Sequence, residues 1–179
     1  GVELAEAQKM VKTYQAQLET WLAGAVRKKI KNLARQLAAK DRLFVLGRGE
    51  LYYPALEFAL KMKEVSYLQT EGFSGGELKH GVIALIEEGT PVVALVARDE
   101  NQAAMLNAVA EIEARGATVI GVSPDDNKLF STWIKTPANN ELMAISSLIP
   151  AQLLTYDLAL ERGLNPDKPR NLAKSVTVK

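Results

Sequence analysis

Residues 43–49 read Leu-Phe-Val-Leu-Gly-Arg-Gly, an apolar run of strand length that ends in two glycines separated by one arginine. Further apolar runs of strand length follow at 91–96, 118–122 and, more weakly, 132–135. Between them lie stretches with helical spacing at about 53–66, 101–115 and 142–162. Apolar strands that alternate with helices predict a mostly parallel sheet covered on both faces. We therefore expect one α/β domain, with a break in its last helix at Pro150.

The N-terminal part of the chain has a different pattern. Residues 3–39 are rich in Ala, Leu, Gln, Lys and Glu, contain no proline and have Gly24 near the middle. Apolar residues recur there at helical spacing, which predicts two helices that are separated near Gly24. We assign residues 1–40 to a helical extension, and residues 41–179, with a tail at 165–179, to the domain. The apolar side of the extension must pack on the domain, on a neighbour absent from this chain, or on a second copy.

The composition excludes several classes of protein. The 179 residues include 22 Lys and Arg against 21 Asp and Glu, so the formal net charge is +1. This balance argues against a nucleic-acid-binding protein, which would show a basic excess. The chain has no cysteine and one histidine, which excludes disulfides, thiolate metal sites and sites that need two imidazoles. We expect a cytoplasmic location and no membrane segment, and the start at Gly1 suggests a piece of a longer protein.

The glycine turn at 47–49 is a weak motif when taken alone. Glycines after a strand let the backbone approach a phosphate, but Tyr52 stands where the third glycine of a dinucleotide fingerprint would fall. No ATP-binding P-loop sequence is present. A tight strand-to-helix turn is the simpler interpretation.

Two other groups of residues have side chains suited to catalysis. Glu57, Lys61 and Glu64 share one helix face, which is typical either of an exposed ion-pair stripe or of a carboxylate that moves a proton beside an ammonium. His80, the one histidine, lies between glycines in residues 75–81 and is either structural or catalytic. Spacing alone leaves both choices open and favours the structural reading.

Several blocks together are similar to one enzyme family. They are Gly-Arg-Gly at 47–49, Tyr-Pro-Ala-Leu-Glu at 53–57, Leu-Lys-Met-Lys-Glu-Val-Ser-Tyr at 60–67, Gly-Glu-Leu-Lys-His-Gly at 76–81, and Lys-Pro-Arg-Asn-Leu-Ala-Lys-Ser-Val-Thr-Val at 168–178. In this order they resemble the isomerase region of the glucosamine-6-phosphate synthases, also called glutamine–fructose-6-phosphate aminotransferases (isomerizing). The resemblance implies the second of two sugar isomerase (SIS) domains, with a flavodoxin-like, three-layer α/β sandwich.

The resemblance also implies a reaction and roles for particular residues. The family aminates fructose 6-phosphate with glutamine-derived ammonia and isomerises it to glucosamine 6-phosphate. By this resemblance Glu64 is the base that moves a proton between C1 and C2, Lys61 assists at the hydroxyls, and His80 opens the sugar ring in the neighbouring subunit. Lys174, in a tail that covers the site, forms a Schiff base with the ketone. Lys61, Ala173 and Lys174 are the predicted substrate-binding residues, and our own inference adds Glu57 as a residue that orients Lys61.

The resemblance also sets limits. The family's glutaminase begins with a cysteine, which this chain lacks, and its phosphate-binding Ser/Thr loop belongs to the first SIS domain and has no counterpart here. Gly81 is followed by Val82 where the family usually has proline. We therefore expect a homodimer that binds a sugar phosphate without metal or organic cofactor, and little activity from this chain without the missing glutaminase and first SIS domains. The alternatives are a stand-alone SIS module for sugar-phosphate binding or dimerisation, and a sugar-phosphate isomerase or deaminase without a glutaminase.

Overall fold

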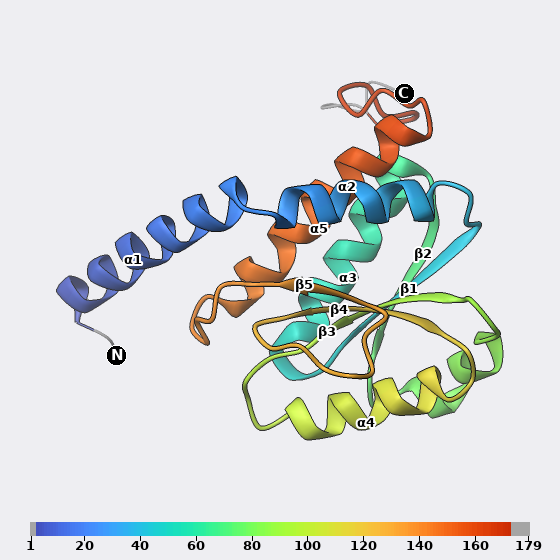
Figure 1. Cartoon of the computed structure of the whole chain (residues 1–179), viewed down its shortest axis with the longest axis horizontal. Helices are drawn as coiled ribbons and strands as arrows, with labels where there is room; N and C mark the ends of the chain where they lie inside the picture. The colour runs from blue at the N-terminus through green and yellow to red at the C-terminus, as the bar shows by residue number, and fades with distance from the viewer. Residues whose placement is uncertain (1–2, 173–179) are drawn as a thin grey trace, which may run out of the picture.

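The computed structural model describes residues 3–172 and contains one five-stranded, fully parallel sheet (Figure 1). The strand order is β2-β1-β3-β4-β5. The strands are β1 (Arg42–Gly47), β2 (Gln69–Ser74), β3 (Pro91–Leu95), β4 (Thr118–Ser123) and β5 (Thr132–Lys135). The chain therefore builds one half of the sheet, returns to the centre and builds the other half, as in flavodoxin-like folds.

Five α-helices accompany the sheet in the described residues: α1 (Leu4–Ala23), α2 (Val26–Leu37), α3 (Tyr52–Lys61), α4 (Gln102–Glu113) and α5 (Met143–Glu161). Figure 1 shows α2, α3 and α5 on one side of the sheet and α4 on the other. The strands alternate accordingly, since Leu43 and Val45 pack with α2, α3 and α5, whereas Phe44 and Leu46 pack with α4. The predicted three-layer α/β sandwich is confirmed.

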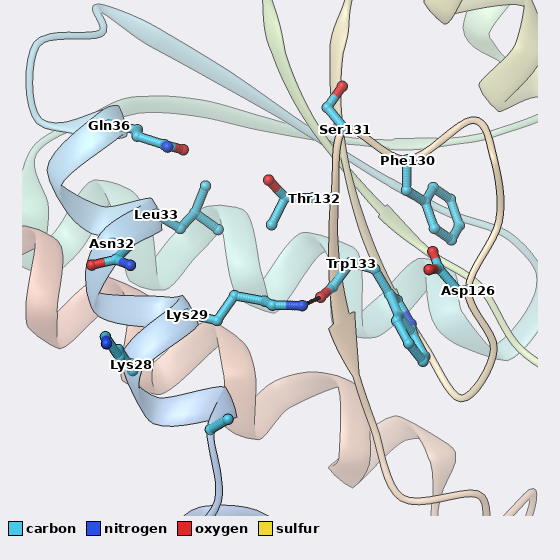
Figure 2. Close-up of a pocket in the computed structure, with 11 residues that line it drawn as sticks. Lys28, Lys29, Asn32, Leu33, Gln36, Asp126, Phe130, Ser131, Thr132 and Trp133 are labelled. Atoms are coloured by element: carbon cyan, nitrogen blue, oxygen red, sulfur yellow. Dashed lines mark hydrogen bonds between the residues drawn. The ribbon is translucent and has the colours of Figure 1, made fainter.

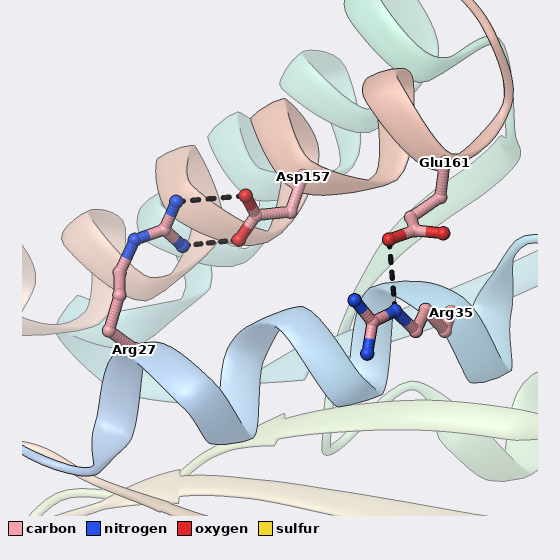
Figure 3. Close-up of polar contacts among 4 residues, drawn as sticks. All are labelled: Arg27, Arg35, Asp157 and Glu161. Carbon is pink, nitrogen blue, oxygen red and sulfur yellow. Dashed lines mark hydrogen bonds and ion pairs between the residues drawn. The ribbon is translucent and has the colours of Figure 1, made fainter.

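The two predicted N-terminal helices behave differently from each other. Helix α2 buries Ile30 and Leu33 in the core, and two ion pairs tie it to α5 (Figure 3). Helix α1 projects away from the sheet (Figure 1), and the one fully buried side chain in it is Tyr14. The Tyr14 hydroxyl is 2.9 Å from that of Ser146 in α5. The boundary at residue 40 stays a prediction, although α2 shares the core of the domain.

Strand β2 is absent from the sequence prediction. Its residues, Gln-Thr-Glu-Gly-Phe-Ser, contain one large apolar side chain and lie at the edge of the sheet. Gly72 is needed there, because a Cβ atom would lie 2.9 Å from the carbonyl oxygen of Ala55 in α3. The strand is therefore defined by its parallel pairing with β1 and by close contact with α3, and not by an apolar pattern.

The predicted break at Pro150 is wrong. Helix α5 runs without interruption from Met143 to Glu161 with Pro150 inside it. A proline in a helix interior costs about 3 kcal/mol, but here Pro150, Ala151 and Leu154 are buried, so packing on both sides offsets the lost hydrogen bond.

Helix α5 is also long and apolar enough to span a membrane by length and composition, with half of that window buried in the protein. Its contacts with α2 and α3 are those of a core helix.

Three 3₁₀ turns complete the connections among the described residues: Gly49–Leu51 before α3, and Leu78–His80 and Val82–Leu85 between β2 and β3.

Candidate functional site

Three charged side chains of α3 and of the turn after it meet on one face. Lys61 Nζ lies 2.5 Å from Glu64 Oε2 and 3.6 Å from Glu57 Oε1. The side chains of Lys61 and Glu64 are 34% and 27% exposed, and that of Glu57 is 45% exposed. Lys61 and Glu64 therefore form a partly buried ion pair that a ligand can reach, and Glu57 holds the ammonium from its other side.

Glu64 lies in a π-helical turn, Met62–Ser66, where the sequence predicts a continuous α-helix to residue 66. The backbone widens after Lys61, a deviation that is rare in proteins and frequent at functional sites. The Ser66 hydroxyl donates to the carbonyl of Met62 at 2.7 Å, and the Arg162 guanidinium donates to the carbonyl of Ser66 at 3.2 Å. These two bonds fix the turn that carries Glu64.

The ion pair determines the protonation of the lysine. The hydrogen bond that Lys61 donates to Glu64 is the largest cause that raises the pKa of the Lys61 ammonium above its usual value, and the charge of Glu57 adds to it. Partial burial of Lys61 opposes the effect without cancelling it. Lys61 is therefore a cation at physiological pH and is suited to stabilise a developing oxyanion.

A small cleft of about 270 Å³ opens beside Glu64. One wall consists of the turn residues Lys63, Glu64 and Tyr67, and the other of the tail segment 170–172. The described part of the predicted covering tail thus borders the predicted base. Ala173 and Lys174 lie outside the described residues. Sequence reasoning missed Tyr67 and Arg170 as site residues, although both stand inside blocks that carry the family resemblance.

His80 is not brought to this cleft. It is exposed in the 3₁₀ turn that follows the carboxyl end of β2, whereas Glu64 lies before the amino end of the same strand. The six residues of β2 span roughly 20 Å. Within one chain, Glu64 and His80 therefore lie beyond opposite ends of strand β2.

The glycine turn after β1 has a structural explanation. A Cβ atom on Gly47 would lie 2.1 Å from the carbonyl oxygen of Leu51, and Gly49 has a positive φ of 58°. Both glycines are therefore required by the tight connection from β1 to α3.

A cavity of about 730 Å³ lies at the carboxyl ends of β1 and β3, where the strand order reverses and ligands commonly bind in this fold. Its lining includes the carboxylates of Glu50, Asp99, Glu100 and Glu141 against the single guanidinium of Arg98. Arg98 is already paired with Asp125, with Nε 2.6 Å from Oδ2. A phosphate group would meet net negative charge there, so this cavity is a poor phosphate site.

Two other hollows flank β5. Figure 2 shows the one of about 480 Å³ between α2 and β5, in which Lys29 donates a 2.7 Å hydrogen bond to the carbonyl of Trp133. The other, about 840 Å³, lies between α1 and the end of β5, where Trp21 donates to the carbonyl of Lys135. In both places a side chain of an N-terminal helix donates a hydrogen bond to a backbone carbonyl of β5. Because β5 is an edge strand, these hydrogen bonds shield carbonyls that could otherwise pair with another chain. The cleft at Glu64 is smaller than either, but it alone among these hollows is lined by a predicted catalytic residue, Glu64.

The chain matches known proteins over most of its length. The family described as SIS domain matches residues 36–162. The chain belongs to the SIS domain family. The glutamine–fructose-6-phosphate aminotransferase (isomerizing) of Streptococcus mutans is 49% identical to this SIS domain over 155 residues, which is 86% of this chain and 25% of the relative. The corresponding protein of Pyrococcus horikoshii is 46% identical over 153 residues.

Solved structures agree with these matches. The C-terminal domain of glucosamine-fructose-6-phosphate aminotransferase from Francisella tularensis superposes with a TM-score of 0.81 and 29% identity, covering 92% of this SIS domain and 47% of that chain. Glucosamine-6-phosphate deaminase from Thermotoga maritima superposes with a TM-score of 0.63 and 30% identity, covering 82% of this chain and 46% of that one. This SIS domain thus matches the isomerase region of the aminotransferases, and it spans about a quarter of the length of the curated relatives.

Proposed function

We propose that this chain is the C-terminal SIS domain, within the isomerase region, of a glutamine–fructose-6-phosphate aminotransferase, which makes glucosamine 6-phosphate from fructose 6-phosphate and glutamine-derived ammonia. The observation that carries the proposal is the 2.5 Å ion pair of Lys61 with Glu64. Glu64 itself lines a cleft that is bordered by the tail segment 170–172. The similarity to the Streptococcus mutans aminotransferase supports the same reaction.

In the proposed mechanism, the Lys174 amine adds to the C2 carbonyl of the open-chain sugar and water leaves, which gives a Schiff base. Ammonia then adds to C2 and displaces the Lys174 amine, which leaves the C2 imine of the sugar. The carboxylate of Glu64 removes a proton from C1 and delivers it to C2, while the proton of the C1 hydroxyl moves to the imine nitrogen, so that the C1 aldehyde and the C2 amine form. The Lys61 ammonium stabilises negative charge on the sugar oxygen during this transfer, and Ala173 is proposed to contact the sugar. None of these steps requires a metal ion, and within residues 3–172 no three His, Asp or Glu side chains are grouped as metal ligands.

His80 requires a partner in this mechanism. Because it lies beyond the other end of β2 from Glu64, we propose that it serves the site of a second copy. Exposed apolar side chains on α3 and α5, including Leu56, Leu60 and Leu160, support a protein partner on the helical face of the domain. We propose a homodimer with each His80 directed to the other subunit.

The phosphate of the substrate is proposed to be bound mainly outside this chain. The cavity at the carboxyl ends of the strands is lined by four carboxylates, and the Glu64 cleft has about 270 Å³, less than a typical ligand pocket. We therefore expect this chain to have little activity without a first SIS domain and a glutaminase. The absence of cysteine fits the reducing cytoplasm, which we propose as its location.

The proposal is tested by grafting this chain in place of the matching region of the Streptococcus mutans aminotransferase. The chimera should form glucosamine 6-phosphate from fructose 6-phosphate and either glutamine or ammonium. Glu64→Gln should lower kcat by roughly 10²–10⁴-fold, the usual contribution of a general base. Glu71→Gln, which changes an exposed carboxylate on β2, is the matched control and should leave kcat within about twofold, as expected for a surface change. Full activity of the Glu64→Gln chimera would contradict the proposal.

A second candidate is a sugar-phosphate isomerase or deaminase without a glutaminase. The 30% identity to the Thermotoga maritima glucosamine-6-phosphate deaminase favours it. The same chimera distinguishes the aminotransferase from the deaminase. A deaminase domain would release ammonia from glucosamine 6-phosphate and would not form glucosamine 6-phosphate when glutamine is the nitrogen source.

A further inference from the structure

The described end of the tail makes two contacts with a single aromatic residue. The backbone amide of Arg170 donates a 2.7 Å hydrogen bond to the hydroxyl oxygen of Tyr67. The guanidinium of the same arginine lies over the Tyr67 ring, 4.0 Å from its centroid. The two residues are 103 positions apart in the sequence, so these contacts bring the tail back onto the turn after α3.

Tyr67 has an unusual backbone conformation for a large side chain. Its φ is 55°, in the left-handed region that glycine and asparagine normally occupy, and it caps the π-helical turn that carries Glu64. A tyrosine in this conformation is strained and persists only where the surrounding structure requires it. Tyr67 follows the proposed base, Glu64, by three residues, and its left-handed conformation directs the ring toward the tail.

The contact is also close to the proposed chemistry. Tyr67, Glu64 and the tail segment 170–172 line one cleft of about 270 Å³. A contact that holds residues 170–172 at the cleft therefore keeps this wall of the site in place beside Glu64.

We propose that Tyr67 and Arg170 form a latch that holds the tail segment 170–172 beside Glu64, and that both are positioning residues for the reaction. The latch itself is inferred from the two observed contacts of Arg170 with Tyr67. Its effect on catalysis rests on the proposed function. The ring contact at an exposed site favours the docked segment about two- to fivefold, and the hydrogen bond about fivefold.

The latch itself is tested without any reaction, by hydrogen exchange of the Arg170 amide in this chain measured by NMR. Tyr67→Phe removes the acceptor and should speed exchange at that amide about fivefold or more. Tyr52→Phe, at the other end of α3, is the matched control and should leave the rate unchanged. Unchanged exchange in Tyr67→Phe would overturn the latch.

The positioning role is tested in the chimera with the Streptococcus mutans aminotransferase. Tyr67→Phe, which removes the hydrogen bond, should lower kcat about fivefold, and Arg170→Ala, which removes the ring contact, about two- to fivefold, with the KM for fructose 6-phosphate and the Tm within error of the parent. Arg170→Lys keeps a cation over the ring and should recover part of kcat.

The outcomes of the two experiments are separable. Faster exchange with unchanged kcat would show a merely structural contact and overturn the positioning role. An inactive parent chimera would refute the proposed function and the positioning role with it, while the exchange experiment would still decide whether the latch exists.

Discussion

Replacing Arg27 by methionine should destabilise this domain strongly, because it leaves the carboxylate of Asp157 buried without its partner. The Asp157 side chain is 5% exposed, and both of its oxygens accept hydrogen bonds from the Arg27 guanidinium, one of them at 2.8 Å (Figure 3). The pair joins α2 to α5. The same hydrogen bonds raise the pKa of Arg27, so the arginine stays charged at any pH at which the protein is folded.

The magnitude follows from the burial of the carboxylate. Removal of one partner of a buried ion pair costs about 3–5 kcal/mol. The Arg27 side chain is 30% exposed, so water can reach part of the vacated space, and we expect roughly 3 kcal/mol, at the lower end of that range. For a chain of this length the loss corresponds to a fall in Tm of about 6–12 °C.

The assay is urea unfolding followed by tryptophan fluorescence, since Trp21 and Trp133 lie beside the N-terminal helices. Arg35→Met is the matched control, because it breaks an ion pair between the same two helices whose side chains are 63% and 35% exposed. That variant should lose at most about 1 kcal/mol. A double variant, Arg27→Met with Asp157→Leu, should recover most of the stability. An Arg27→Met protein within 1 kcal/mol of the parent would refute the reasoning.

Three further outcomes are expected. Glu64→Gln should lower the pKa of Lys61 toward its usual value, because the hydrogen bond to Glu64 is the main cause of its elevation; NMR titration of the lysine measures this. In the parent, this pair contributes stability below the unfolded pKa of about 10.4 and loses it as pH rises through the higher folded value. Arg162→Met removes the charged donor from two backbone carbonyls and should cost about 1.5–3 kcal/mol in urea unfolding. Gly47→Ala places a Cβ 2.1 Å from the Leu51 carbonyl oxygen and should lower the Tm, whereas an unchanged Tm would show that the turn adjusts freely.

Much of the fold could be predicted because most strands are buried on both faces. The apolar runs at 43–46, 91–96 and 118–122 coincide with β1, β3 and β4 to within a residue or two at each end. Strand β2 escaped prediction because it is an edge strand with a polar, glycine-containing sequence. Its place is set by hydrogen bonds to β1, a contact that no local pattern encodes.

The errors in the helices have a related cause. Pro150 is a strong local signal for a helix break, but burial of α5 between its neighbours outweighs that preference. The π-helical turn at Met62–Ser66 is likewise set by tertiary contacts, among them the hydrogen bond from Arg162 to the Ser66 carbonyl. Local sequence preferences do not encode such tertiary contacts.

The candidate site was only partly accessible to sequence reasoning. The grouping of Glu57, Lys61 and Glu64 follows from helical spacing, and the structure brings them together. The contact of Tyr67 with Arg170 joins segments 103 residues apart and depends on a left-handed tyrosine, so it could not be predicted from periodicity.

The most direct test of the proposed chemistry is solvent deuterium exchange at C1 and C2 of the sugar. In the chimera with ammonium and fructose 6-phosphate in D₂O, the parent should place deuterium at these carbons as product forms, because a carboxylate that moves a proton exchanges part of it with solvent. Glu64→Gln should slow this exchange by at least about 100-fold, and Glu71→Gln should not change it. Exchange at the parent rate in the Glu64→Gln protein would contradict the assignment of Glu64 as the base.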